Sequence, residues 1–172
     1  GFQESTGAGW SVASMVNMGT GLPMKVPDKQ NQYGDAENFL PGATAIGDIL
    51  KEQGYEQTVM FGANADFGGL TYYFQSHGDY TIIDHKEVKK RGYVPKNYKV
   101  FWGYEDDKLY EFAKDELTRL YETGKPFHLM METADTLYGV TMPRHGISKV
   151  FTLEEYQHTY YKVCFFFYQG TF

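Results

Sequence analysis

The sequence is poor in cysteine, in positive charge and in long apolar runs. Its 172 residues include one cysteine, Cys164, which excludes an internal disulfide framework and a zinc site built from several cysteines. The formal net charge is -6 and no run of Lys and Arg is present, which argues against a nucleic-acid-binding surface. No apolar run approaches the ~20 residues that a membrane-spanning helix needs.

The beginning of the chain has neither a Met nor a basic segment followed by an apolar core, so it contains no recognisable signal peptide. We therefore expect a piece of a longer protein. Residues 1–172 are expected to form one α/β domain or part of one, and the sequence assigns no fold to residues 137–172. That last stretch carries a dense aromatic tail over residues 160–168 that other parts of the protein must cover.

Enough apolar sequence is present for a real core, since 42% of the residues are hydrophobic. Apolar residues recur at helical spacing before glycines, and β-forming runs follow them. The pattern predicts helices and strands that alternate, with a short strand at 100–103 and a central strand at 127–132. The predicted helices cover 45–53, 70–77 and 104–123, and the other predicted strands cover 57–62 and 80–84. Alternation of this kind favours a mostly parallel central sheet with helices on both faces.

A glycine-flanked turn, Gly7-Ala8-Gly9-Trp10, runs directly into an apolar segment that can start a helix. Backbone N–H groups at such a turn suit an anion such as phosphate or sulfate. In parallel sheets, ligands bind beyond the carboxyl ends of the strands. We therefore expect the site edge at residues 62–69 and 133–137, with Glu132 and Asp135 as the nearest carboxylates.

Other polar residues have simpler interpretations. Asp84 and His85 form an Asp-His pair, but their position after a short strand favours a helix cap over a metal site. His128 is interpreted as a core histidine whose hydrogen bonds are satisfied, and His145 as part of a surface loop. Trp10 either walls a ligand pocket or packs in the core, and the sequence favours neither.

Three blocks of sequence are similar to one family. They are GAGWSVASM with GLPMKVP, FLPGATAIGDILKEQGYEQTVMFGANADFGG, and FWGYEDDKLYEFAKDEL with PFHLMMETADT. Over about residues 2–136 the chain resembles the sulfatase-like lipoteichoic acid synthases and phosphoglycerol transferases of the alkaline phosphatase superfamily. The resemblance implies an extracytoplasmic enzyme beside a membrane. In it, manganese or zinc activates a Thr that transfers a phosphoglycerol or phosphoethanolamine headgroup from lipid to an acceptor.

The resemblance also points to departures from the family pattern. Ala8 occupies the position of the Thr nucleophile, and Leu70 that of a basic residue that contacts the headgroup. Leu137 stands where the family has a His, and the family's metal ligands have no clear counterparts, so we assign no metal ligand. The resemblance assigns substrate binding to residues of the opening turn, the loop after the first strand and the end of the last strand: Gly7, Gly9, Trp10, Asn64, Asp66 and Thr136.

Two functions from different classes follow. The first is a phosphoglycerol transferase whose chemistry is lost in this chain because of Ala8. The second is a non-catalytic module that binds anionic glycolipid or glycerol-phosphate polymer. Hydrolysis of sulfate esters ranks last because the sequence has no Cys/Ser-x-Pro-x-Arg motif.

Overall fold

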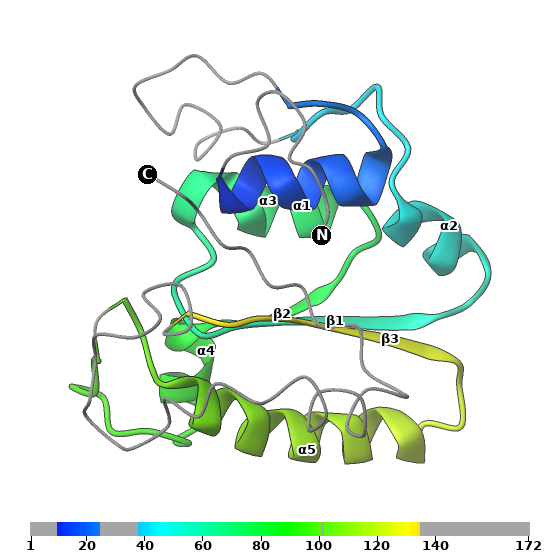
Figure 1. Cartoon of the computed structure of the whole chain (residues 1–172). Coiled ribbons are helices and arrows are strands. Elements are labelled where there is room, and N and C mark those ends of the chain that lie inside the picture. Colours follow the sequence, from blue (N-terminus) through cyan, green and yellow to red (C-terminus); the bar gives the residue numbers. More distant parts are fainter. Residues whose placement is uncertain (1–9, 25–37, 101, 135–172) are drawn as a thin grey trace, which may run out of the picture.

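A computed structural model describes residues 10–24, 38–100 and 102–134 of the chain (Figure 1). The predicted alternation of helices and strands is confirmed there. The elements in chain order are α1 (Ser11–Thr20), α2 (Ile46–Glu52), β1 (Glu56–Phe61), the 3-10 turn η2 (Phe67–Gly69), α3 (Leu70–Ser76), β2 (Thr81–Ile83), α4 (His85–Lys90), α5 (Asp106–Glu122) and β3 (Phe127–Glu132). The fold of residues 137–172, including the aromatic tail, lies outside the described residues.

The three strands form one parallel sheet in the order β2-β1-β3. Phe61 at the end of β1 lies opposite Glu132 at the end of β3, so the two strands end together. The prediction that residues 127–132 form the central strand is wrong for the described sheet, whose middle strand is β1. The burial of β1 explains its position, because five of its six residues are buried and it is covered on both faces.

Helices cover both faces of the sheet, as predicted. Figure 1 shows α1 and α3 over one face and α4 and α5 over the other. Side chains of β1 alternate between the two layers: Val59 and Phe61 pack in the cluster of α1 and α3, and Met60 packs with Leu109 and Phe112 of α5. This period of two is what a strand between two helix layers requires.

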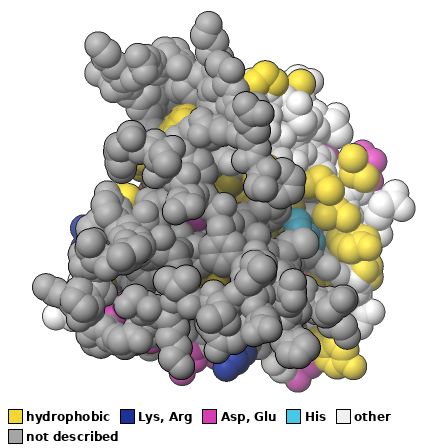
Figure 2. All heavy atoms as spheres, in the orientation of Figure 1, with side chains coloured by type: hydrophobic (Ala, Val, Ile, Leu, Met, Phe, Trp, Pro, Cys, Tyr) yellow, Lys and Arg dark blue, Asp and Glu magenta, His cyan; other side chains and the backbone are white. Residues whose placement is uncertain are grey.

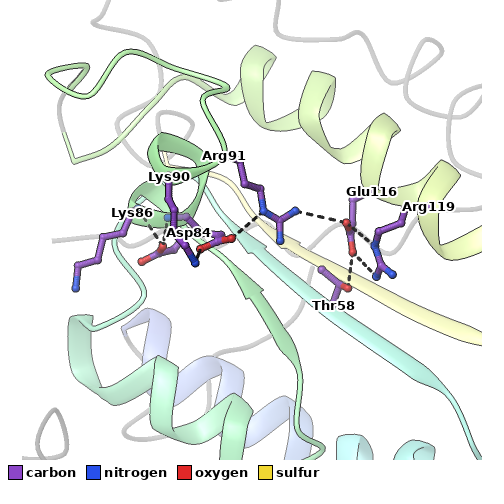
Figure 3. A network of polar contacts seen from close by, with 8 residues as sticks. Thr58, Asp84, Lys86, Lys90, Arg91, Glu116 and Arg119 are labelled. Atoms are coloured by element: carbon purple, nitrogen blue, oxygen red, sulfur yellow. Dashed lines mark hydrogen bonds and ion pairs between the residues drawn. The ribbon is translucent and has the colours of Figure 1, made fainter.

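A buried carboxylate ties α5 to the sheet. Glu116 is 4% exposed, and its Oε1 accepts a hydrogen bond of 2.7 Å from the Thr58 hydroxyl of β1. Arg119 donates to both carboxylate oxygens, and Arg91, which follows α4 directly, lies 3.8 Å away (Figure 3). Burial raises the pKa of Glu116, but the bonds from Arg119 and Thr58 outweigh it and the pKa is lowered. The network therefore joins α4, α5 and β1 through a charged group.

The apolar face predicted for the second helix does not pack as expected. The helix itself is confirmed as α2, and Gly54 adopts the left-handed conformation that ends it. However, Ile46 and Ile49 are 53% and 52% exposed, and Figure 2 shows apolar side chains gathered on the surface over α2. The helix instead brings Gly47 against the backbone of His77, where a Cβ would lie 2.3 Å from the carbonyl oxygen.

Two further predictions concern short or apolar segments. The predicted strand at residues 100–103 is wrong, since Val100 and Gly103 form an isolated antiparallel bridge and no sheet strand. Within the described part of the chain, no helix has the length and apolar character to span a membrane.

Candidate functional site at the carboxyl edge of the sheet

The carboxyl ends of the three strands are joined by backbone hydrogen bonds. The Gly62 N–H donates to the Glu132 carbonyl at 3.0 Å, and the Tyr104 N–H donates to the Gly62 carbonyl at 2.9 Å. The His85 N–H donates to the Ala63 carbonyl at 3.1 Å, which ties the end of β2 to the loop after β1. These bonds hold the segments that follow all three strands at one edge, where parallel sheets bind ligands.

Asp84 is a helix cap, as predicted. Its Oδ1 accepts hydrogen bonds from the N–H groups of Lys86 and Glu87, each 3.0 Å long. Its Oδ2 accepts a further bond of 3.2 Å from the Ala65 N–H. The neighbouring His85 ring contacts the Tyr98 carbonyl through Nε2 at 2.9 Å, and burial lowers the pKa of this imidazole. Asp84 and His85 thus both make their polar contacts with groups of the protein itself.

The loop after β1 contains two residues predicted to bind substrate. The Asn64 side-chain oxygen accepts a 3.1 Å bond from the Asp66 N–H, which fixes the turn. The Asp66 carboxylate accepts a 3.1 Å bond from the Thr71 hydroxyl and forms an ion pair with Lys86. The bond from Lys86, opposed by burial, lowers the pKa of Asp66. The side chains of Asn64 and Asp66 therefore organise the loop, and their predicted contact with substrate stays a prediction.

The start of α1 lies against this loop. The Trp10 ring packs against the core cluster and also meets the Phe67 ring edge-on, with centroids 6.2 Å apart. Phe67 is 55% exposed, so the contact joins the core to the surface of the site. The structure therefore supports the packing role of Trp10, and its predicted contact with a ligand stays a prediction.

Ser11 lies three residues after Ala8 and was not among the predicted site residues. It is the first residue of α1, and its hydroxyl lies close enough to the Glu132 carboxyl at the end of β3 to lower the pKa of that carboxyl. Burial raises the pKa of Glu132 to about 7, assisted by the negative charge of Asp106, while the nearby Ser11 hydroxyl acts in the opposite direction. The sequence does contain a signal for Ser11. It is a residue with a hydroxyl group directly after a Gly-Trp turn, at the first position of a helix.

The described residues do not bring together a metal-binding set. No group of three His, Cys, Asp or Glu side chains suited to a metal ion is present in the ranges that the structure describes. Asp106, at the start of α5, uses its Oδ1 to accept a 2.8 Å bond from the Ala134 N–H. The described acids at this edge are thus not arranged as a metal site.

The histidines in the described part of the chain lie in structural positions. Nδ1 of His128 is 2.8 Å from the Tyr80 hydroxyl, and burial lowers the pKa of the ring. The predicted hydrogen-bonded role is supported at this nitrogen, but the residue is half-buried and does not belong to the core. His77 is buried, with Nδ1 3.0 Å from the Asp48 carboxylate and Nε2 2.8 Å from the Phe39 carbonyl. Leu70 occupies the position where the resemblance expects a basic residue that contacts the headgroup. Its side chain is 2% exposed and belongs to the core.

Several predicted site residues lie outside the described residues. They are the turn residues Gly7, Ala8 and Gly9, the segment with Asp135, Thr136 and Leu137, and His145. Their assignments stay predictions.

Comparison with known proteins shows which family the chain resembles. The sequence pattern of the sulfatase family matches residues 3–136. Proteins named phosphoglycerol transferase I are 37% identical in Xanthomonas campestris, over 77% of this chain and 19% of the relative, and 31% identical in Escherichia coli, over 78% and 17%. The chain thus spans about a fifth of the length of these relatives.

A solved structure of a protein in the alkaline phosphatase superfamily from Vibrio parahaemolyticus has the same fold. It superposes with a TM-score of 0.58 at 25% identity, over 82% of this chain and 33% of the other. Proteins of this superfamily are usually metal-dependent. Sequence and fold agree, and the chain belongs to the sulfatase family of the alkaline phosphatase superfamily.

Proposed function

We propose that this chain is the part of a phosphoglycerol transferase that holds the phosphate group during transfer. The enzyme would take phosphoglycerol, or phosphoethanolamine, from a membrane lipid and pass it to an acceptor in the cell envelope, on the extracytoplasmic side. Residues 1–172 would form one sulfatase-like unit or a fragment of it. The relatives named phosphoglycerol transferase I and the arrangement at the carboxyl edge support this proposal.

The observation that carries a catalytic role is the contact between Ser11 and Glu132. In the proposed first step, the Ser11 oxygen bonds to phosphorus and its proton passes to Glu132. The bond between phosphorus and the lipid alcohol breaks, and the leaving alcohol takes up the proton that Glu132 received. A carboxylate whose pKa is about 7 suits this exchange, because a catalytic base works best when its pKa lies near the working pH.

A metal in the family would supply charge neutralisation at the phosphate oxygens. Manganese or zinc is the expected ion, and its ligands would have to come largely from segments beyond those described.

The second candidate is a binding module without turnover. The observation that favours it is Ala8, because a methyl group at the position of the family's Thr cannot attack phosphorus. In that case the chain would bind anionic glycolipid or glycerol-phosphate polymer through the same edge of the sheet and release no product.

Two substitutions separate the candidates. The chain, Ser11→Ala and Ala8→Thr are incubated with a chromogenic phosphoglycerol ester in the presence of manganese or zinc. If Ser11 attacks, the chain releases the chromophore and gains a phosphoglycerol group on the peptide that contains Ser11. The Ser11→Ala variant then loses activity on the order of 10³-fold or more. Turnover that appears only in Ala8→Thr would mean that the chain is a phosphoglycerol transferase inactivated by Ala8. Binding of the ester without turnover in all three proteins would support the non-catalytic binding module.

A further inference from the structure

Three carboxylic acids lie at the carboxyl edge of the sheet. Asp66, Asp84 and Glu132 all follow or end strands there. A phosphate ester is itself an anion, and like charges at close range repel. The position at which the family resemblance expects a base is Leu70, and this side chain is buried in the core. A cation that meets the ligand must therefore come from another element.

Lys86 is a cation at this edge, and it connects α4 with the loop after β1. It lies in the first turn of α4, directly after β2, and its ammonium group pairs with Asp66 in the loop after β1. Its side chain is 62% exposed, so the ammonium group is open to a ligand. The pair raises the pKa of Lys86 and lowers that of Asp66, so both groups are charged at neutral pH.

Two nearby cations, Lys90 of α4 and Arg91 directly after it, are paired elsewhere. Lys90 and Arg91 both bind Glu87, at 3.2 and 2.9 Å, and Arg91 also faces the Glu116 network. Figure 3 shows the Lys86 side chain leaving α4 away from that network. Lys86 is thus separated from the cations that hold α4 and α5 together.

A short chain of contacts connects Lys86 with the start of α1. Asp66, its partner, precedes Phe67, and the Phe67 ring meets Trp10, which precedes Ser11. An ammonium group has three N–H donors, so it can remain bonded to Asp66 while it donates to a second oxygen. The Asp66 carboxylate cannot face an anion favourably, but it can hold the ammonium in place.

We propose that Lys86 binds the negatively charged phosphate of the glycerol phosphate group, and that Asp66 is a positioning residue for its ammonium group. This inference rests on the proposed function, because it names the residue that the ligand meets at the same site. The contact replaces the base that Leu70 does not provide. The ligand chemistry is glycerol phosphate, presented either free or as the headgroup of a lipid.

The test measures binding of free glycerol 3-phosphate by calorimetry in the chain and in three variants. Lys86→Gln should weaken binding about tenfold or more, since a hydrogen bond between two charged groups is lost. Lys86→Arg keeps the charge and should retain most of the affinity. Lys90→Gln removes an exposed lysine from the same helix, four residues on, and should leave the affinity unchanged. The dependence of binding on salt should be smaller in Lys86→Gln than in the chain.

A parallel measurement uses vesicles of phosphatidylglycerol against vesicles of phosphatidylcholine. A Lys86→Gln loss with both free and vesicle-bound glycerol phosphate supports the contact. A loss confined to the vesicles would assign Lys86 to the charge of the membrane surface and overturn it. Equal binding by the chain and Lys86→Gln overturns the inference alone, whereas no binding by the unmodified chain overturns the proposed function as well.

Discussion

At the scale of single residues, the same chemical group behaves differently according to its surroundings. Asp66 and Glu132 are both carboxylic acids at the carboxyl edge, but the pKa of the first is lowered by Lys86 and that of the second is raised by burial. The ion pair favours the charged form of Asp66, and the loss of water favours the neutral form of Glu132. Only Glu132 can therefore change its protonation near neutral pH.

Glu132→Gln should change how stability depends on pH. A carboxyl whose pKa is about 7 in the folded state, against an ordinary 4.5, stabilises the fold below pH 4.5 and loses this contribution as the pH rises to 7. The variant should be more stable than the parent at pH 8, by on the order of 2 kcal/mol, with little difference in pH response between pH 8 and 9.

Urea unfolding at pH 5 and pH 8 measures this difference. Glu122→Gln, on the exposed end of α5, is the control and should follow the parent at both pH values. If Glu132→Gln lost as much stability as the parent between pH 5 and pH 8, Glu132 would not be the group that titrates.

At the scale of elements, close approach of backbones fixes the carboxyl edge. Gly103 leads into Tyr104, whose N–H bonds the Gly62 carbonyl after β1. A Cβ at Gly103 would lie 2.0 Å from the Gly62 oxygen and 2.9 Å from the Ala63 Cα. These obstacles are backbone atoms, so they cannot move aside as a flexible side chain would.

Gly103→Ala should therefore destabilise the fold by about 2–3 kcal/mol, since the segment before α5 must move away from β1. Gly42→Ala is a matched control, because no atom lies within 4 Å of a Cβ at that position. Thermal unfolding of the two variants compares them. Equal melting temperatures would mean that the edge adjusts freely and that its backbone contacts do not hold the site.

The elements themselves were largely predictable, because their signals are local. Leu109, Phe112 and Leu120 recur at helical spacing in α5 and are buried, and the Asp84 cap depends on residues two and three positions away. Ile46 and Ile49 show the limit of such patterns, since helical spacing cannot say whether another element covers that face. The order of the strands in the sheet also depends on contacts between distant segments. The prediction that residues 127–132 form the central strand was therefore wrong, and β1 has that position.

Contacts between distant segments explain why the site was only partly predicted. Ser11 and Glu132 are far apart in sequence, and parallel strands with helices between them are needed to bring them together. The ion pair of Asp66 and Lys86 likewise depends on β1 and β2 ending at one edge. The sequence identified the edge and the loop, but the partners of each side chain required the fold.

At the scale of the whole molecule, the described chain is a small part of the proteins it resembles. It spans about a fifth of the phosphoglycerol transferase I relatives and a third of the Vibrio structure. Its described sheet has three strands, and its described acids form no metal-binding group. These facts lead us to expect that the 172-residue chain by itself does not bind a metal ion tightly.

A thermal melt of the metal-stripped chain tests this expectation. An ion that binds only the folded state at a hundredfold excess over its Kd stabilises by about 2.7 kcal/mol, which for a chain of this size raises the melting temperature by about 5–10 °C. We expect manganese and zinc to raise it no more than magnesium, which controls for ionic strength. A larger rise with manganese or zinc would contradict the expectation. Its loss in Glu132→Gln, but not in Glu122→Gln, would then locate the ion at the carboxyl edge beside Ser11.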